Sequence, residues 1–195
     1  NVVRAMGSVP EAVGPMADMV RAVLFEGSVA TSTRAAMGLR VAQLVRSPYV
    51  AAHMVRVIAA SPDEQAWRPF FRDNQAAGLT PRQRQAIAYA ESLTRDIHGV
   101  TDEQFAQVRA HFTDNEVVEL TIVTAFFNHL VRFAEATRLP VEPWAFEPPS
   151  TPLPFVVDIK AAPRVGLISD AEIAATTAAA AAATDAAAQK GGLGL

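Results

Sequence analysis

The sequence has no cysteine among its 195 residues. This absence excludes disulfides, thiolate metal ligands, CxxC redox centres and cysteine nucleophiles. Charge is also sparse, since charged residues make up 19% of the chain and the formal net charge is −3. Such a chain presents no basic field, so we expect neither nucleic acid nor an anionic membrane surface as its partner.

Signals for export or membrane insertion are missing as well. No charged leader with an apolar segment opens the chain, and the only long apolar run is the alanine tract after Thr177. We therefore expect a cytoplasmic protein. Apolar residues reach 50%, which is rich for a small monomer and predicts a homo-oligomer that covers part of this surface.

Apolar residues recur at helical spacing over much of the chain, as Met37, Val41, Leu44 and Val45 do. No strand alternation of useful length occurs, so the predicted fold class is all-α. Ser47 is expected to cap a helix that starts at Pro48. Predicted helices span about 15–27, 32–46, 48–60, 81–96, 101–112 and 115–138, with a less regular segment over 61–80. On the helix over 115–138, the residues predicted to face inward are Val118, Ile122, Ala125, Phe126, Leu130 and Phe133.

The composition changes after Glu142, where six prolines fall within residues 142–163. We expect a helical domain over 1–143, a proline-rich linker over 144–168 and an alanine-rich helix over 169–195.

Two segments resemble the carboxymuconolactone decarboxylase and AhpD-like alkylhydroperoxidase superfamily. The first is RAAMGLRVAQLVRSPYVAAH, which begins at Arg34 and ends at His53. The second carries LTP, YAE, VTD, ELT and NHLVRF in order between residues 79 and 133. The resemblance implies an AhpD-like bundle of about six to eight helices that assembles as a dimer, trimer or hexamer.

The departures from this family concern its redox centre. The two cysteine positions of redox-active members fall on Ser47 and Val50, the histidine position on Met54 and the glutamate position on Ala35. A serine hydroxyl cannot replace a thiolate in disulfide exchange. Thiol peroxidase activity is therefore not expected.

The chain ends differ from the family pattern too. Residues 160–195 resemble the leader and first helix that precede Asn-Val-x-Arg-Ala in family members, whereas here Asn1 begins the chain. This order suggests a circular permutation in which the last helix packs as the family's first. An ordinary C-terminal extension is the alternative.

The candidate catalytic residues are His53, Asn128 and Arg132. His53 is a candidate general base, because imidazole titrates near neutrality. Asn128 and Arg132 lie four residues apart on one helix face, where they could hold a carboxylate. A salt bridge from Arg132 to Glu91 or Glu119 is the alternative.

Three further residues are candidates for substrate binding. Tyr49 shares a helix face with His53, Ser47 lies at the turn before it, and Trp67 is expected to line a pocket or an interface. A serine–histidine nucleophile is also conceivable, but a helix cap explains Ser47 better. The four histidines show no metal-binding spacing, so no metal or other cofactor is expected.

Two functions agree with these residues. The first is a cofactor-independent acid–base enzyme of the decarboxylase or isomerase type, acting on a small carboxylate or lactone. It requires that His53, Asn128 and Arg132 line one cavity. The second is a non-catalytic member that binds a small-molecule ligand or serves oligomerisation only.

The missing thiols give a direct prediction. Purified, metal-free protein should leave alkyl hydroperoxides unchanged in the presence of a dithiol reductant, because the electron transfer needs a sulfur nucleophile. Hydroperoxide consumption above that of a heat-denatured sample would contradict the prediction.

Overall fold

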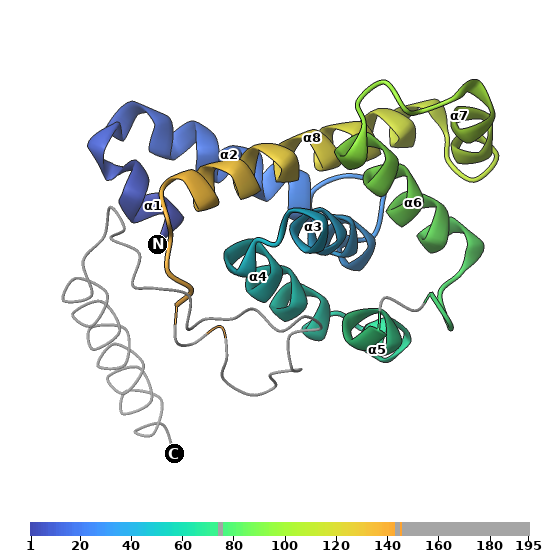
Figure 1. Cartoon of the computed structure of the whole chain (residues 1–195), viewed down its shortest axis with the longest axis horizontal. Helices are drawn as coiled ribbons and strands as arrows, with labels where there is room; N and C mark the ends of the chain where they lie inside the picture. The colour runs from blue at the N-terminus through green and yellow to red at the C-terminus, as the bar shows by residue number, and fades with distance from the viewer. Residues whose placement is uncertain (74–75, 143–144, 146–195) are drawn as a thin grey trace, which may run out of the picture.

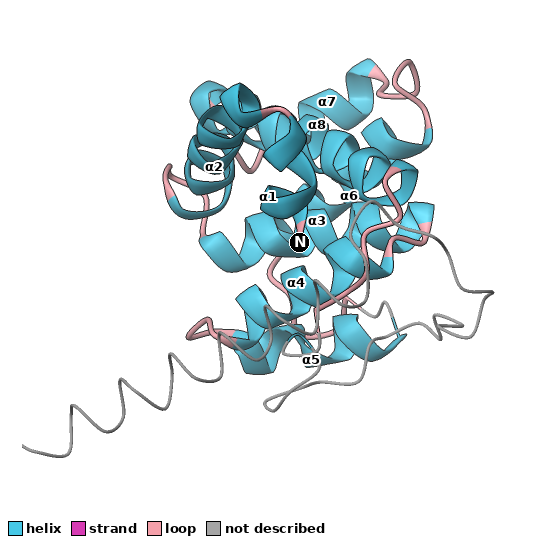
Figure 2. Ribbon diagram, turned by 90° about the vertical axis from the view of Figure 1, so that its left-hand side faces the viewer, coloured by secondary structure: helices cyan, strands magenta, loops and turns pink. Residues whose placement is uncertain are grey.

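The computed structural model describes residues 1–73, 76–142 and 145. Its elements run in order α1 (Val2–Ala5), a 3₁₀ turn η1 (Met6–Ser8), α2 (Pro10–Phe25), α3 (Thr31–Val45), α4 (Pro48–Ala59), α5 (Glu64–Asp73), α6 (Pro81–Arg95), α7 (Asp102–Arg109) and α8 (Asp114–Ala136). The described residues form no strand, and the all-α prediction is confirmed (Figures 1 and 2). Apart from Ala145, the predicted linker and last helix, and with them the packing of a permuted chain, lie outside the described residues.

Helix α3 is the centre of the bundle and packs against α4, α6 and α8 (Figure 1). Its buried residues extend without a break from Ser32 to Leu39. Gly38 permits the close approach to α8, because a Cβ at this position would lie 2.5 Å from the ring of Phe127. By length and composition α8 could cross a membrane, but its burial in this bundle accounts for its apolar character.

Local capping sets several helix starts as the sequence predicts. Thr80 and Thr101 each form a full capping box with the glutamine three residues later. A third box begins α8, where Thr113 is the cap in place of the predicted Asp114 or Asn115. Its partner is Glu116, whose carboxylate accepts from the Thr113 backbone at 2.9 Å.

Three helix predictions are wrong. The segment predicted to be irregular contains α5, and α2 begins at Pro10, because proline suits a first helical position and the helix tolerates Pro15 inside. The predicted inward face of α8 is wrong in the first half of the helix, where it is rotated by about one residue. Val118 and Ile122 are 59% and 48% exposed, whereas Val117 and Leu120 are buried. Phe126 and Leu130 are buried, as predicted.

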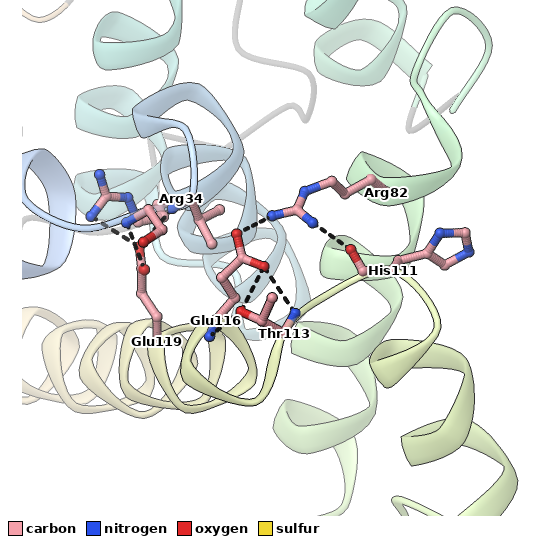
Figure 3. A network of polar contacts seen from close by, with 8 residues as sticks. Arg34, Arg82, His111, Thr113, Glu116 and Glu119 are labelled. Atoms are coloured by element: carbon pink, nitrogen blue, oxygen red, sulfur yellow. Dashed lines mark hydrogen bonds and ion pairs between the residues drawn. The ribbon is translucent and has the colours of Figure 1, made fainter.

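A buried ion pair fixes the connection from α2 to α3 (Figure 3). Arg34 is 2% exposed, and its guanidinium lies 3.3 Å from the Glu119 carboxylate of α8 while also donating to the Glu26 carbonyl. The same carboxylate accepts from the backbone nitrogens of Ser28 and Val29 at 2.9 and 3.1 Å. Burial lowers the pKa of Arg34, and the charge of Glu119 opposes this effect. The pair therefore anchors the C-terminal end of α2.

The close contact at Gly38 predicts a specific loss of stability. Gly38→Ala should lower the free energy of unfolding by about 1–3 kcal/mol, because the fully buried Phe127 ring must move to admit the methyl group. Urea denaturation measures the change. Gly7→Ala is the control, since a Cβ there meets nothing within 4 Å. Equal midpoints for the two variants would contradict the packing argument.

Candidate functional site

A cavity of about 640 Å³ lies between α2 and α4, with α8 contributing to its wall. From α2 come Met16, Val20, Leu24 and Phe25; from α4 come Tyr49, Val50, His53, Met54, Arg56 and Val57; Phe126 and Leu130 of α8 close it, together with Val2, Thr31, Ala60, Ser61 and Pro62. Most of these side chains are apolar. Its volume and lining are typical of pockets for small organic ligands.

His53 lines the cavity and has a carboxylate partner. Its Nε2 lies 2.9 Å from Oε2 of Glu142, which is 8% exposed. The other carboxylate oxygen accepts from the Tyr49 hydroxyl at 3.2 Å and from the amino group of Asn1. The Tyr49 and His53 rings are 4.6 Å apart between centroids. These residues form one polar cluster at the edge of an apolar cavity.

The chain path explains how Glu142 reaches α4. After α8 ends, the backbone turns at Thr137 and Arg138 and passes beside the start of the chain (Figure 1). The Asn1 side chain donates to the Pro140 carbonyl at 2.9 Å, and the Val2 backbone donates to the Tyr49 hydroxyl at 3.1 Å. Glu142 thus closes the bundle by joining the segment after α8 to α4.

Glu142 is a carboxylate over the whole physiological pH range. Burial alone would raise its pKa, but hydrogen bonds from His53 and from the Asn1 amino group, and the charge of His53, lower the pKa to about 2. Burial and the neighbouring carboxylate raise the pKa of Tyr49, so its hydroxyl stays protonated. The cluster therefore combines the Glu142 carboxylate, the amino group of Asn1 that pairs with it and the neutral hydroxyl of Tyr49.

Of the residues predicted to bind substrate, Tyr49 lines the cavity and Ser47 and Trp67 do not. Ser47 is the N-cap residue of α4, which starts at Pro48 as predicted, but its fully buried hydroxyl makes no capping hydrogen bond and does not line this cavity. Trp67 is also fully buried, and its indole nitrogen donates to Asp63 at 3.0 Å. Both side chains are therefore part of the core and not of the cavity wall.

Asn128 and Arg132 share a face of α8, as predicted, but lie outside the residues that line the cavity. The Asn128 amide donates to Thr94 of α6 at 2.9 Å, and Arg132 donates to the Asn128 side chain at 2.9 Å. Two residues along a helix correspond to a turn of about 200°, so Asn128 points away from Phe126 and Leu130. The prediction that they line one cavity with His53 is wrong.

The alternative partners proposed for Arg132 are wrong too. Glu119 pairs with Arg34, and Glu91 pairs with Arg40 and Arg95 at 2.8 and 2.7 Å. Within the described residues, no group of three or more histidine, aspartate or glutamate side chains comes together as metal ligands would.

Sequence reasoning missed Glu142, because it lies between Pro140 and Pro143 where the chain resembles the start of a linker. The available signal was a single acid in an otherwise apolar segment directly after the longest helix. An isolated acid of this kind needs a partner once it is buried.

Solved structures with this arrangement of helices are known. A peroxidase-related protein from Silicibacter sp. TM1040 is 24% identical, with a TM-score of 0.66 over 72% of this chain and 75% of that one. An AhpD-core, peroxidase-related protein from Ralstonia eutropha JMP134 is 19% identical, with a TM-score of 0.63 over 72% and 76%.

This chain has the AhpD-like fold. The debrominase Bmp8, solved as a cysteine-to-alanine variant in complex with 2,3,4-tribromopyrrole, shares it at 15% identity, with a TM-score of 0.67 over 74% of this chain and 78% of that one. No family model matches the sequence, and no curated protein matches it. The AhpD-like resemblance is thus confirmed at the level of the fold, here in a chain without cysteine.

The low pKa of Glu142 predicts how stability depends on pH. The pKa of about 2 in the folded chain lies below the ordinary value of 4.5, so the stabilisation is complete above about pH 5 and is lost as the pH falls from 4.5 to 2. Urea denaturation should show Glu142→Gln less stable than the parent chain by at most about 3 kcal/mol at pH 6. The difference in the free energy of unfolding between the variant and the parent chain should disappear toward pH 2.

Asp18→Asn is the matched control. Asp18 is 74% exposed and pairs with Arg21 on the surface of α2, so its removal should change the free energy of unfolding by less than about 1 kcal/mol. A gap for Glu142→Gln that stays constant between pH 6 and pH 2 would show that its charge does not stabilise the fold.

Proposed function

We propose that this AhpD-like chain is a thiol-free acid–base enzyme that binds a small, largely apolar carboxylate or lactone beneath α2 and moves a proton with His53. The form of this function that the sequence suggested, with His53, Asn128 and Arg132 in one cavity, is excluded by the positions of Asn128 and Arg132, and the proposal depends on His53 and Glu142 instead. One observation carries the proposal: the His53 imidazole lines the cavity while the Glu142 carboxylate holds it from behind at 2.9 Å. A histidine oriented by a buried carboxylate is the arrangement that general-base catalysis uses.

The pairing defines the protonation of the ring. A carboxylate only accepts hydrogen bonds, so Nε2 carries the hydrogen that Glu142 accepts, and the neutral ring then has its basic lone pair on Nδ1. When His53 takes a proton, the resulting imidazolium is paired at once with a negative charge. The apolar surroundings strengthen this attraction relative to water. Glu142 is thus a positioning residue for His53.

The proposed chemistry needs no redox partner. His53 removes a proton from the carbon beside a carbonyl group, and the electron pair of the C–H bond moves to the carbonyl oxygen as an enolate. Return of the proton at another carbon gives an isomer. In a decarboxylation, the C–C bond to the carboxylate breaks, carbon dioxide leaves, and the electron pair of that bond moves to the carbonyl oxygen as an enolate. His53, in its protonated form, then supplies a proton to the carbon that carried the carboxylate.

Passive ligand binding is the second candidate. It is favoured by the other contacts of Glu142, which accepts from Tyr49 and from Asn1 and so also has a structural use. In that case His53 lines the cavity and pairs with Glu142, but it catalyses no reaction.

The homo-oligomer also remains a proposal. Exposed apolar side chains on α8 and α2 support it, because such surface is costly to leave in water. The largest are Val118, Ile122, Met19 and Phe25, which are 59%, 48%, 47% and 58% exposed.

Isomerisation of a β,γ-unsaturated γ-lactone with a hexyl side chain tests the enzyme. In D₂O, NMR should show the α,β-unsaturated product with deuterium at the γ carbon. His53→Gln should lower kcat by about a hundredfold or more, since general-base catalysis contributes this much. Glu142→Gln should lower kcat by about tenfold or more, because the imidazolium loses its counter-charge.

Binding is measured separately by the fluorescence of the neutral probe N-phenyl-1-naphthylamine. His53→Gln and Glu142→Gln should bind it with a Kd close to that of the parent chain, and His98→Gln, on the exposed surface, should retain both binding and turnover. Probe binding without any turnover would favour passive ligand binding. Absence of probe binding would overturn both candidates.

A further inference from the structure

The outer face of α8 carries a regular stripe of exposed residues. Its members recur every three or four residues along the helix: Asn115, Val118, Ile122, Ala125, His129 and Arg132. The stripe lies opposite the core, because Ile122 and His129 follow the fully buried Leu120 and Phe127 by two residues, a turn of about 200°. Two large apolar side chains, Val118 and Ile122, thus face away from the bundle at its centre.

Neighbouring helices flank this stripe without covering it. On one side, Glu119 accepts from the backbone of Ser28 and Val29, so the end of α2 lies beside this half of α8. On the other side, Asn128 donates to Thr94 of α6. Figure 1 shows α8 along the upper side of the bundle, with α3 and α4 below it. The stripe is therefore open to a partner that approaches from outside the bundle.

The spacing of the stripe reads the same in both directions. From Asn115 to Arg132 the steps are three, four, three, four and three residues, the alternation of helices that pack along a seam. An antiparallel second copy of α8, related by a twofold axis between Ile122 and Ala125, would match every member with another member. Ile122 would then lie against Ala125 of the partner subunit, so that a large side chain packs over a small one.

The two ends of the stripe are complementary in charge. The first turn of α8 carries Asp114, whereas His129 and Arg132 lie toward the other end of the helix. The antiparallel arrangement brings the acidic end of one helix beside the basic end of the other, and it opposes the two helix dipoles. An apolar centre with a polar rim is the usual composition of a protein interface.

We propose that α8 pairs with α8 of a second copy of this chain, antiparallel and about a twofold axis between Ile122 and Ala125. This inference rests on the homo-oligomer proposed above and names its contact surface. The seam from Asn115 to Arg132 is about 26 Å long at 1.5 Å per residue. Phe25, 58% exposed at the end of α2 beside α8, adds apolar surface toward the area of about 1,000 Å² that a stable interface needs.

The absence of cysteine allows the seam to be mapped by disulfide cross-linking. The double variant Val118→Cys and His129→Cys places each new thiol opposite the other kind in the partner subunit. Mild oxidation of the full chain should therefore give a covalent dimer on a non-reducing gel. The two positions are about 17 Å apart along one helix, too far for a bond within the chain, since a disulfide needs Cα atoms within about 7 Å.

Each single variant is a control for this geometry. Val118→Cys alone, or His129→Cys alone, should give little covalent dimer, because equivalent residues also lie about 17 Å apart across the proposed axis. Strong cross-linking by Val118→Cys alone would indicate parallel helices and would overturn the antiparallel pairing.

Light scattering tests the same seam without cysteine. Ile122→Glu should weaken dimerisation by about a hundredfold or more, because it places an unpaired charge from each copy at the apolar centre. Ile97→Glu is the matched control, since Ile97 is 75% exposed and lies outside the stripe, and it should leave the mass unchanged. Circular dichroism should show parental helicity for both variants, because neither side chain is part of the core.

The failures of the seam and of the earlier proposals can be told apart. A monomeric parent chain at about 0.1 mM would overturn the seam and the homo-oligomer together, and the acid–base proposal would still be decided by probe binding and lactone turnover. A parent dimer that survives Ile122→Glu and shows no cross-link in the double variant would overturn the seam alone. A trimer would do so as well, because a twofold contact cannot close a ring of three.

Discussion

The carboxylate of Glu142 is the contact on which the site depends. Its two oxygens hold the imidazole of His53, the hydroxyl of Tyr49 and the amino group of Asn1. A buried charge with fewer partners would be costly, whereas this one is compensated by donors from α4 and from the start of the chain. The contact therefore closes the bundle and orients the ring at the same time. Because Glu142 contributes both to the stability of the fold and to the orientation of His53, its effect on unfolding and its effect on turnover must be measured separately.

The fold forms without thiols because the turn between α3 and α4 is held by packing and backbone contacts. Ser47 occupies a position that carries cysteine in the resembled redox-active family, yet its hydroxyl is sealed in the core without a partner. The Ser47 backbone amide still closes α3 by donating to the Ala42 carbonyl at 2.8 Å. A nucleophile at this position could not reach the cavity. In the proposed function the reactive side chain is instead His53, six residues further along the chain on α4.

The sequence was sufficient for the features that local physics decides. Thr80 and Thr101 begin helices because their hydroxyls and the following glutamines satisfy free backbone groups nearby. The sequence alone did not predict contacts between segments that lie far apart along the chain. The pairing of Arg34 with Glu119, and of His53 with Glu142, joins residues 85 and 89 positions apart, and no local pattern specifies such partners. Asn128 and Arg132 show the same limit, since their shared face was predictable but its direction, set by α6, was not.

Arg132 illustrates this limit. An arginine four residues from an asparagine suggests a carboxylate site, yet Arg132 donates to its own helix, at the carbonyl and side-chain oxygen of Asn128. His53 has no such sequence signature, but the periodicity of α4 places it on the same face as Tyr49 at the wall of the cavity, where Glu142 reaches it. In an apolar cavity the position of one ionisable side chain outweighs the number of charged residues nearby, because unpaired charge is excluded from the rest of the wall. The geometry of α4 therefore decides that His53 is the imidazole beside the cavity.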